Sequence, residues 1–426
     1  MNKELTKIIS LVIIGIFALQ GCQQAEEDTS SLAKISVQEV EALKKKNIYS
    51  SLVLGENTVL MAAEDGMLLT KIDIGLNDAS SSKQFKNIGS NFNIPSFKSY
   101  EQIEKQFLLK TVDSNETNTT DETPDNPKIY SMLKLTDGIL IGGKFAMVNG
   151  IEKDNLVKLK YDGSIDNSFS GSIIGAVYKM LKIESNIYIA GVFGGYNDNE
   201  AYSIIKINPQ GISDTNFLPF KDYFLAKIND IEAYGSDKLI LAGTFIKEIT
   251  VEDENTSKEE LLTMTKSILI IDKNGNILDE ESNKFNDIRN EAFSIVKDEN
   301  RLYIAGDFEF IKKTVLYNNL VAYSFDGEHD ESFSIDKLNG MIFDLSVSED
   351  KIIFGGDFIA EDDNSTNRSF YIVDKMGKTI KIDNFTSDAD IYNIDVYNGN
   401  IIISGEGEFK VNDQNFANSI MLKISQ

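Results

Sequence analysis

The sequence predicts an all-β protein, a β-propeller built from repeated blades. One observation is a short signature, an apolar run followed by Gly, one variable residue and Phe, which recurs about every fifty residues. A second is the pattern between the copies, where short runs rich in β-branched and aromatic residues alternate with turns of Gly, Asp and Asn. No convincing amphipathic helix interrupts this series, and a repeat of this length suits a four-stranded propeller blade.

The signature has five complete copies and one looser copy. From Gly to Gly they lie 48, 52, 63, 50 and 49 residues apart. The complete copies are Gly143 with Phe145, Gly191 with Phe193, Gly243 with Phe245, Gly306 with Phe308, and Gly356 with Phe358, and the looser one carries Gly405.

Packing explains this signature better than binding does. A Gly inside a strand is usually kept where a bulge forms or where another backbone passes close by. The Phe is expected to fill the apolar layer between neighbouring blades. A ring of metal or phosphate ligands would need one chemistry in every copy. The residue between Gly and Phe shows none, since it is Lys144, Val192, Thr244, Asp307 and Asp357 in successive copies.

The repeats predict seven blades across residues 48–426. A first, degenerate unit has the same order of features, with Ala63 at the place of the signature Gly. Seven units over this span are about 54 residues each, as expected for a propeller blade with modest loops. The competing count is six blades preceded by a separate N-terminal segment.

One unit resembles a known family. The arrangement "GKF...NG...NLVKLKYDGSIDNSF" at residues 143–169 is similar to the delta-60 repeat, a bacterial β-propeller repeat with a Gly-Gly-x-Phe core, an Asn-Gly loop and an Asp-Gly turn before Asp-x-Ser-Phe. Residues 301–333 match this repeat well, and the other units match it in part. The resemblance implies a propeller in an exported or cell-surface bacterial protein, and it implies no catalytic residues.

The N-terminus predicts an exported, lipid-anchored protein. Two lysines precede a short apolar run, which is typical of a signal peptide at residues 1–21. The run ends in residues that resemble a bacterial lipobox, namely Leu19, Gln20, Gly21 and the acceptor Cys22. The alternative is an incidental cysteine in a conventional signal peptide. By analogy, Gln23 after the cysteine favours the outer membrane or the surface of the bacterial cell envelope.

Residues 22–47 are expected to form a lipidated tether and an N-terminal segment ahead of the propeller at residues 48–426. The part "SVQEVEALKKKN" has a helix-like composition, whereas "AKISV" at residues 33–37 is a candidate for the outer strand of the last blade. Such a strand would close the ring, because the last unit lacks a fourth strand of its own.

The chain is strongly acidic, with a formal net charge of -25. Such a surface repels phosphate backbones and anionic headgroups, so no nucleic acid is expected as a partner, and the lipid anchor is the only expected membrane contact. Solubility of an exposed surface explains the acidity without a cationic partner. The expected partner is a protein or glycan of the envelope or the extracellular space.

Two polar insertions, residues 111–127 and 247–265, break the regular spacing. Long loops on a rigid scaffold often carry binding residues, so both are candidate contact regions. Surface excursions without a partner are the alternative.

No residue pattern predicts an enzyme or a cofactor. The one histidine, His329, is expected to be a solvated turn residue, and the chain has no zinc-protease, P-loop or dinucleotide-binding fingerprint. The alternative function is a propeller hydrolase or lyase that acts on glycans or peptides through central carboxylates.

Calcium is the metal worth considering, at Asp272, Asn274 and Asn276. These alternating oxygen side chains have a spacing that hard cations use. The same stretch takes the place of a hairpin turn in other units, so a turn without metal is the preferred interpretation. The predicted function is therefore a binding or protein-interaction module of the cell envelope, without catalysis.

Overall fold

The computed structural model describes residues 34–38, 48–55, 58–63, 70–73, 97–98, 127–252, 259–335, 338–360, 368–382, 384–397 and 399–425. Nearly all regular structure in these residues is β, and their one α-helix, α3 (Asp279–Ser282), continues into a 3-10 turn, η3 (Asn283–Phe285). None of the described helices is long and apolar enough to cross a membrane. The lipobox, Leu19 to Cys22, lies outside the described residues.

The described strands form eight antiparallel sheets. The small sheet contains β5 (Phe97–Lys98), β8 (Met147–Val148) and β9 (Ile151–Glu152). The larger sheets contain β2 (Ile48–Gly55), β3 (Thr58–Ala63) and β4 (Thr70–Asp73); β6 (Lys128–Lys134), β7 (Ile139–Lys144) and β10 (Leu156–Leu159); β11 (Ile173–Ile183), β12 (Asn186–Tyr196), β13 (Asn199–Glu200) and β14 (Ile204–Ile207); β15 (Leu225–Tyr234), β16 (Lys238–Glu252) and β17 (Glu259–Asp272); β18 (Glu291–Lys297), β19 (Arg301–Lys312) and β20 (Val315–Ser324); β21 (Leu338–Ser348), β22 (Lys351–Ala360) and β23 (Arg368–Asp374); and β24 (Phe385–Ser387), β25 (Asp390–Tyr397), β26 (Asn400–Val411), β27 (Gln414–Ser425) and β1 (Lys34–Gln38).

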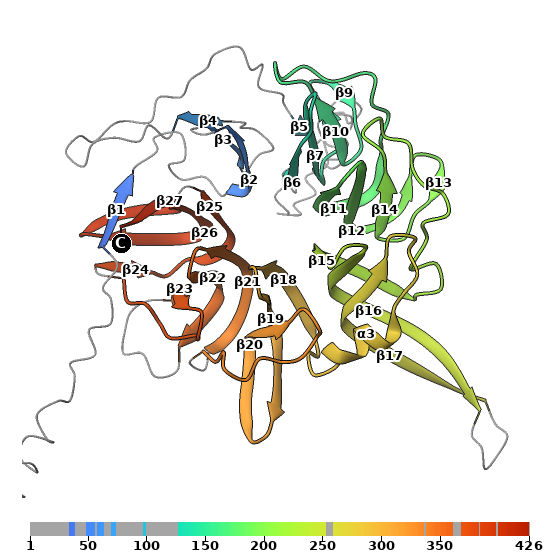
Figure 1. Ribbon diagram of the computed structural model, residues 1–426. Coiled ribbons are helices and arrows are strands. Elements are labelled where there is room, and N and C mark those ends of the chain that lie inside the picture. The colour runs from blue at the N-terminus through green and yellow to red at the C-terminus, as the bar shows by residue number, and fades with distance from the viewer. Residues whose placement is uncertain are drawn as a thin grey trace, which may run out of the picture.

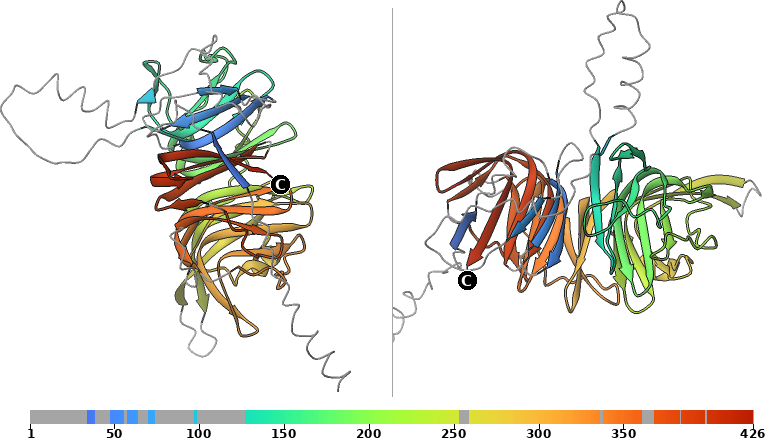
Figure 2. Two further views of the ribbon diagram at one scale, coloured as in Figure 1. Left: turned by 90° about the vertical axis from the view of Figure 1, so that its left-hand side faces the viewer. Right: turned by 90° about the horizontal axis from the view of Figure 1, so that it is seen from above.

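The larger sheets surround a common centre (Figure 1). The strands nearest to the centre, which we call the inner strands, are β2, β6, β11, β15, β18, β21 and β25. Each contacts the next in this order, and β25 contacts β2 again, so the inner strands form a closed series. Seen from the side, the sheets form a slab (Figure 2). This arrangement is a β-propeller.

The first described strand belongs to the last sheet. β1 pairs with β27 in antiparallel register, from Lys34 opposite Ser425 to Gln38 opposite Met421. The structure thus realises one of the two expectations for the N-terminal segment, an outer strand contributed to the last sheet. The two ends of the described chain are joined by this strand pair, which closes the ring.

The signature Gly lies where two strands approach too closely for a side chain. A Cβ added at any signature Gly would stand 1.9–2.2 Å from a carbonyl oxygen of the inner strand of the same sheet. For Gly306 this oxygen belongs to Glu291. In register, Ala63 lies opposite Ile48 as Gly306 lies opposite Ala292, so Ala63 occupies the signature position of the first sheet.

The signature Phe side chains are buried between sheets. All of them are at most 6% exposed, and they are Phe145, Phe193, Phe245, Phe308 and Phe358. Each belongs to an apolar cluster that combines residues of two neighbouring sheets. Burial of such a side chain contributes roughly 1.5–3 kcal/mol, so these clusters supply much of the stability of the ring.

The slab has two faces. At one, which we call the mouth face, the inner strands begin and the strands paired to them end. At the other, the turn face, hairpins join these two strands.

The described residues of the insertion at 247–265 belong to strands, contrary to the expectation of a loop from its polar composition. In these residues β16 and β17 form a hairpin that is paired from Lys247 opposite Met264 to Glu252 opposite Glu259. This hairpin projects outward from the ring (Figure 1). The insertion contains several β-branched residues, which favour a strand, although its many acidic residues suggested a loop. Of the insertion at 111–127, only Pro127 is described.

Candidate functional site at the mouth of the central channel

Every inner strand carries a β-bulge at the same place. On β18, for example, the pairing with β19 shifts by one residue between Ala292 and Ser294. A bulge leaves its extra residue unpaired and re-aims that side chain. We call the residues skipped in this way the mouth ring, and they are Tyr49, Tyr130, Tyr178, Asn229, Phe293, Phe343 and Tyr392.

The first arc of the mouth ring consists of three tyrosines from consecutive inner strands. Tyr130 meets Tyr49 and Tyr178 edge to face, with ring centroids 6.0 and 5.4 Å apart. All three side chains are half-buried. Contacts between aromatic rings of this kind add to the stability of the packing, and the exposed part of each ring remains available to a ligand.

The second arc follows on the inner strands β18, β21 and β25, of which β25 contacts β2 and so adjoins the first arc. Phe343 meets Phe293 edge to face at 5.6 Å and stacks on Tyr392 at 5.7 Å. Tyr392 is 40% exposed. Asn229 on β15 interrupts the aromatic series between the arcs, and its amide donates a hydrogen bond of 2.7 Å to Glu291 Oε1.

Beyond the bulges a belt of polar groups links each inner strand to the next. We call it the polar belt. Its bridges are Ser50 Oγ to Ile129 O (3.1 Å), Met180 N to Ser131 Oγ (3.0 Å), Lys179 Nζ to Asp230 Oδ1 (2.9 Å), Ile295 N to Asp230 Oδ2 (3.0 Å), Ser294 Oγ to Asp344 Oδ1 (3.3 Å), Ile394 N to Asp344 Oδ2 (2.7 Å), and Ser51 Oγ to Asp395 Oδ2 (2.6 Å). Every junction in the closed series of inner strands has such a bridge, so the belt holds the ring together.

Ser294 stands between two carboxylates of the polar belt. Its Oγ is 3.4 Å from Asp230 Oδ2 and 3.3 Å from Asp344 Oδ1. The Ser294 hydroxyl has one hydrogen, which it can donate to only one of the two carboxylates. The other contact becomes a hydrogen bond when that carboxyl group is protonated and donates its hydrogen to the Ser294 oxygen. Burial raises the pKa of Asp344 to about 7, although Lys179 and the backbone N–H of Ile394 favour the ionised form. Asp344 is therefore the group of the belt that holds this proton near neutral pH.

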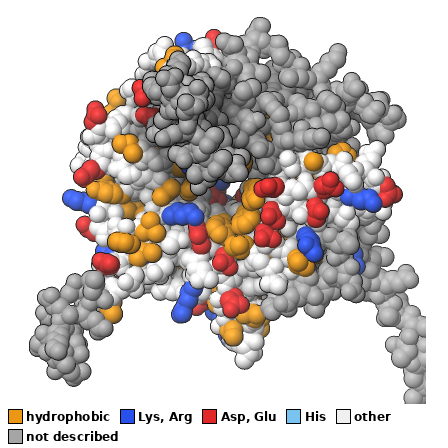
Figure 3. Space-filling view, turned by 180° about the vertical axis from the view of Figure 1, so that it is seen from behind, with side chains coloured by type: hydrophobic (Ala, Val, Ile, Leu, Met, Phe, Trp, Pro, Cys, Tyr) orange, Lys and Arg blue, Asp and Glu red, His pale blue; other side chains and the backbone are white. Residues whose placement is uncertain are grey.

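Lys179 shows that the channel admits solvent. Its side chain is 45% exposed, although it is surrounded by inner strands and pairs with Asp230, which is 4% exposed. Burial lowers the pKa of Lys179, but the charges of Asp230 and Asp344 outweigh burial and raise it. Solvent therefore reaches this charged side chain between the inner strands. Figure 3 shows a small opening near the middle of the mouth face.

The mouth face gathers exposed apolar side chains. Figure 3 shows this face, with hydrophobic side chains on both sides of the opening. The large exposed apolar residues at the beginnings of inner strands, beside these beginnings or at the ends of the strands paired to them are Ile174 (66% exposed), Phe224 (74%), Leu225 (37%) and Ile359 (43%). Grouped exposure of this kind on one face marks an interaction surface.

The stretch considered for calcium is a turn in the structure. Asp272 Oδ1 accepts hydrogen bonds from the backbone N–H of Asn274 (2.8 Å) and Asn276 (2.9 Å), and its Oδ2 accepts one from Asn276 Nδ2 (2.8 Å). Asp374 makes the same pair of backbone contacts in another sheet. The carboxylate is thus engaged by its own turn. Among the described residues, no group of three acidic, histidine or cysteine side chains is placed to hold a metal ion.

His329 is not the solvated turn residue that the sequence suggested. Its ring lies against Phe310, Tyr317 and Tyr323, with centroids 5.5, 4.4 and 5.3 Å apart. Both ring nitrogens are buried without a hydrogen-bond partner. Burial, followed by the charge of Lys312, lowers its pKa, so the ring is neutral at pH 7. His329 does lie in the turn that follows β20, as expected, but the extended β19–β20 hairpin covers its ring.

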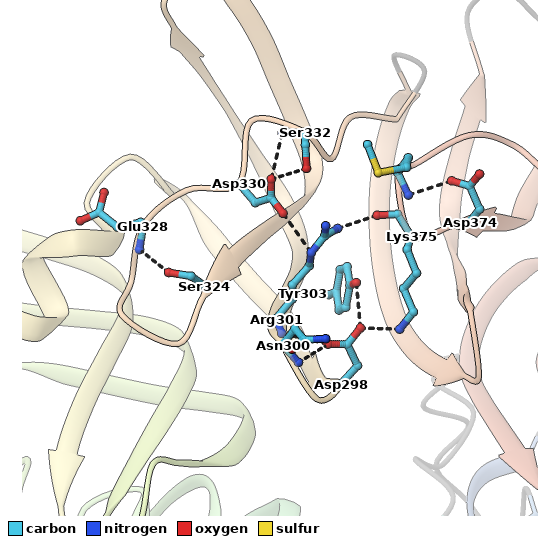
Figure 4. Close-up of polar contacts among 11 residues, drawn as sticks. Asp298, Asn300, Arg301, Tyr303, Ser324, Glu328, Asp330, Ser332, Asp374 and Lys375 are labelled. Carbon is cyan, nitrogen blue, oxygen red and sulfur yellow. Dashed lines mark hydrogen bonds and ion pairs between the residues drawn. The ribbon is translucent and has the colours of Figure 1, made fainter.

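The Asp-x-Ser-Phe motif builds the turn face. Asp330 Oδ1 accepts hydrogen bonds from Ser332 N (2.9 Å) and Oγ (2.5 Å), while its Oδ2 pairs with Arg301 Nε (2.9 Å) (Figure 4). Arg301 Nη1 donates to the carbonyl oxygen of Lys375 in the next sheet at 2.5 Å, and Lys375 pairs with Asp298. Burial opposes ionisation of Asp298, but hydrogen bonds from Lys375 and two backbone N–H groups outweigh it and lower the pKa. This network is structural and joins two sheets.

The mouth ring was missed in the sequence, although a signal for it exists. Each inner strand carries an apolar or small residue, then usually an aromatic, then a polar residue, as in "IYS", "VYK", "AFS", "IFD" and "IYN". The triplet begins at Ile48 in the first sheet, which has no signature Gly. Its meaning depends on the bulge, because an ordinary strand would direct the aromatic and polar residues to opposite sides.

Comparison with known proteins supports the propeller repeat. The family model described as "Domain of unknown function (DUF5122) beta-propeller" matches residues 135–169. These residues run from the second strand of the β6 sheet to the buried Phe169. No curated protein matches the chain in sequence.

Three solved structures resemble the chain at low sequence identity. The computationally designed Ika8 protein is 11% identical, with a TM-score of 0.42 over 89% of this chain and 97% of that one. The AfRom2 CNH domain is 10% identical, with a TM-score of 0.41 over 92% and 99%. Drosophila Semaphorin 1a, extracellular domains 1-2, is 9% identical, with a TM-score of 0.42 over 90% and 87%. TM-scores this low carry no argument, so the fold rests on strand pairing and on the family model.

Proposed function

We propose that this protein is a lipid-anchored, extracytoplasmic β-propeller that binds a partner at its mouth face. The observation that supports this most directly is the mouth ring, because seven bulges re-aim largely aromatic side chains toward one end of the channel. Packing alone does not require half-exposed aromatic residues at the axis. A rigid ring that presents them on one face is suited to recognition.

The proposed blade count is seven, each blade built from a delta-60-like repeat. The closed series of inner strands supports this count, and so does the register that puts Ala63 in the signature position of the first sheet. The Asp-x-Ser-Phe turns at Asp166 and Asp330 support the repeat type, because both aspartates accept hydrogen bonds from the serine two residues later.

The proposed location is the bacterial cell envelope, with the lipid on Cys22 as the membrane anchor. The support is the lipobox-like sequence from Leu19 to Cys22 after an apolar run. Intact-mass analysis of the protein from its own membrane fraction tests this. We expect a diacylglyceryl mass on the native N-terminus and none in a Cys22→Ser variant, whereas an unmodified native N-terminus would refute the anchor.

We propose binding without catalysis. The central carboxylates that a hydrolase or lyase would use are Asp230 and Asp344, and both are committed to the polar belt. Asp230 accepts from Lys179 and from two backbone N–H groups, and Asp344 accepts from the backbone N–H of Leu345 and Ile394. A general acid or base must face its substrate, and these oxygens face neighbouring strands.

Photo-crosslinking in the native cells tests the binding face. A benzoylphenylalanine at Tyr392 would report on the mouth face, and one at Met376, which is 53% exposed at a turn on the opposite face, serves as the control. We expect a discrete crosslinked partner from position 392 and none from position 376. Crosslinking from position 376 alone would place the binding surface on the turn face.

A further inference from the structure

The two aromatic arcs of the mouth ring differ in the charges beside them. Beside the first arc the chain supplies a cation, since Lys128 Nζ lies 5.6 Å from the centroid of the Tyr49 ring. Beside Asn229, Lys227 Nζ pairs with Glu291 Oε1 at 2.6 Å. Both lysines stand two residues before a bulge. In the second arc the same position holds Glu291 on β18, Met341 on β21 and Asp390 on β25. Lys227 therefore neutralises Glu291 at the β18 end, and β21 and β25 carry no lysine at this position.

Besides Glu291, three carboxylates lie beside the β21 and β25 end of the second arc. Asp390 is opposite Glu406 in the sheet, and Asp357 is opposite Met341 on the neighbouring sheet. Burial, followed by the charges of Asp357 and Glu406, raises the pKa of Asp390. Burial also raises the pKa of Tyr392, and the charges of all three carboxylates raise it further. The negative charges of these carboxylates therefore act on one another and on the side chain of Tyr392. Within the described residues, none of the three carboxylates has an ion-pair partner.

We propose that the second arc of the mouth ring, Phe293, Phe343 and Tyr392, binds an arginine or lysine side chain from a basic segment of a protein partner. This inference rests on the binding function proposed above and names the chemistry of its ligand. The aromatic faces attract a cation, and Asp357, Asp390 and Glu406 complement its charge and accept its hydrogen bonds.

The chain contains a model for this contact on the next inner strand after β25, where Lys128 Nζ lies over the ring of Tyr49 on β2. A neutral glycan would stack on the same aromatic residues but would leave the repulsion among the carboxylates in place. A bare metal ion would need three acidic groups close together, and the described part of the chain places no such group. An organic cation such as an arginine side chain, whose charge is spread over several atoms, suits three carboxylates that are not gathered around one point.

Calorimetry on the purified mature protein tests this inference, with the peptide acetyl-Gly-Arg-Gly-Arg-Gly-amide as the probe at about 0.15 M salt. We expect Asp357→Asn combined with Glu406→Gln to weaken binding about tenfold, which corresponds to about 1.4 kcal/mol. Tyr392→Leu should weaken binding about threefold through loss of the cation–π contact. The matched control, Asp326→Asn with Glu328→Gln, removes the same charge at exposed positions of the turn face and should change the Kd less than about twofold.

A peptide with citrulline in place of arginine keeps the shape and loses the charge, so it should not bind. Equal weakening by both double variants would show that only the overall acidity attracts the peptide, and this would overturn the inference. Equal binding of the citrulline peptide, or absence of binding by the arginine peptide, would also overturn it. If the crosslink at position 392 forms while the arginine peptide fails, the binding function stands and only the cationic ligand is refuted.

Discussion

Gly306 faces the carbonyl oxygen of Glu291 so closely that a Cβ on Gly306 would stand 2.2 Å from it. The glycine and the bulge lie side by side in the strand pair, and the absence of a side chain at Gly306 permits the bulge. Because Gly306 has no side chain, the inner strand can press its backbone against the neighbouring strand and skip one residue, and the skipped residue, Phe293, turns toward the channel. In the six sheets that carry a signature Gly, the repeat signature and the bulge therefore occur together, whereas the first sheet forms its bulge at Tyr49 opposite Ala63.

Replacement of Gly306 by Ala is expected to destabilise the fold by roughly 1–3 kcal/mol, because the new methyl group collides with the backbone of Glu291. Urea unfolding measures this. Gly194→Ala is the matched control, since no atom lies within 4 Å of the added Cβ there, and its effect should stay within about 0.5 kcal/mol. Similar stabilities of the two variants would contradict the close approach.

The pH dependence of stability reports the proton of Asp344. Its pKa of about 7 in the folded protein lies above that of the unfolded chain, about 3.9. Between these values the folded state holds a proton that the unfolded state has lost. Asp344 therefore contributes stability that is complete below about pH 4 and is lost as the pH rises through about 7.

An Asp344→Asn variant cannot make this exchange. The stability of the native protein relative to this variant should fall by roughly 2–4 kcal/mol between about pH 4 and about pH 8, the lower figure allowing for water in the channel. Urea unfolding at the two pH values measures the difference, and Asp326→Asn on the turn face is the control. A constant difference would mean that folding does not raise the pKa of Asp344.

Arg301 is expected to be irreplaceable by lysine. Its Nε pairs with Asp330 and its Nη1 donates to the carbonyl oxygen of Lys375, and one ammonium group cannot span both acceptors. Arg301→Lys should cost about 1–2 kcal/mol, most of the cost of Arg301→Ala, in thermal unfolding. Lys313→Ala breaks an ion pair of a side chain that is 75% exposed and should have little effect. A native melting temperature for Arg301→Lys would show that the network does not join the sheets.

The propeller was predictable because its signal is repeated and local. Glycine and phenylalanine two residues apart mark the second strand of each sheet, and the structure gives both a packing role. The register of Ala63 also follows from the order of features around it. Burial and close approach leave the same residue types in every copy, which one sequence can reveal.

The site was harder to predict, since it depends on contacts between distant segments. Glu291 and Gly306 are fifteen residues apart in the sequence and lie on different strands. Neither strand alone indicates that a bulge forms where they meet. The cover over His329 comes from a hairpin whose extra length reads as a polar loop. The tyrosine arc joins residues from three inner strands, and only the closed ring brings them together.

A disulfide across the ring closure tests the central claim most directly. Ser51 Oγ on β2 lies 2.6 Å from Asp395 Oδ2 on β25, although the two residues are 344 positions apart. In a Cys22→Ser background, Ser51→Cys with Asp395→Cys should form an intramolecular disulfide on mild oxidation, seen as one crosslinked pair in a non-reducing digest. Ser51→Cys with Asp326→Cys should form none. Free thiols or only intermolecular links in the first variant would contradict a ring of seven blades closed between β25 and β2, and would favour six blades.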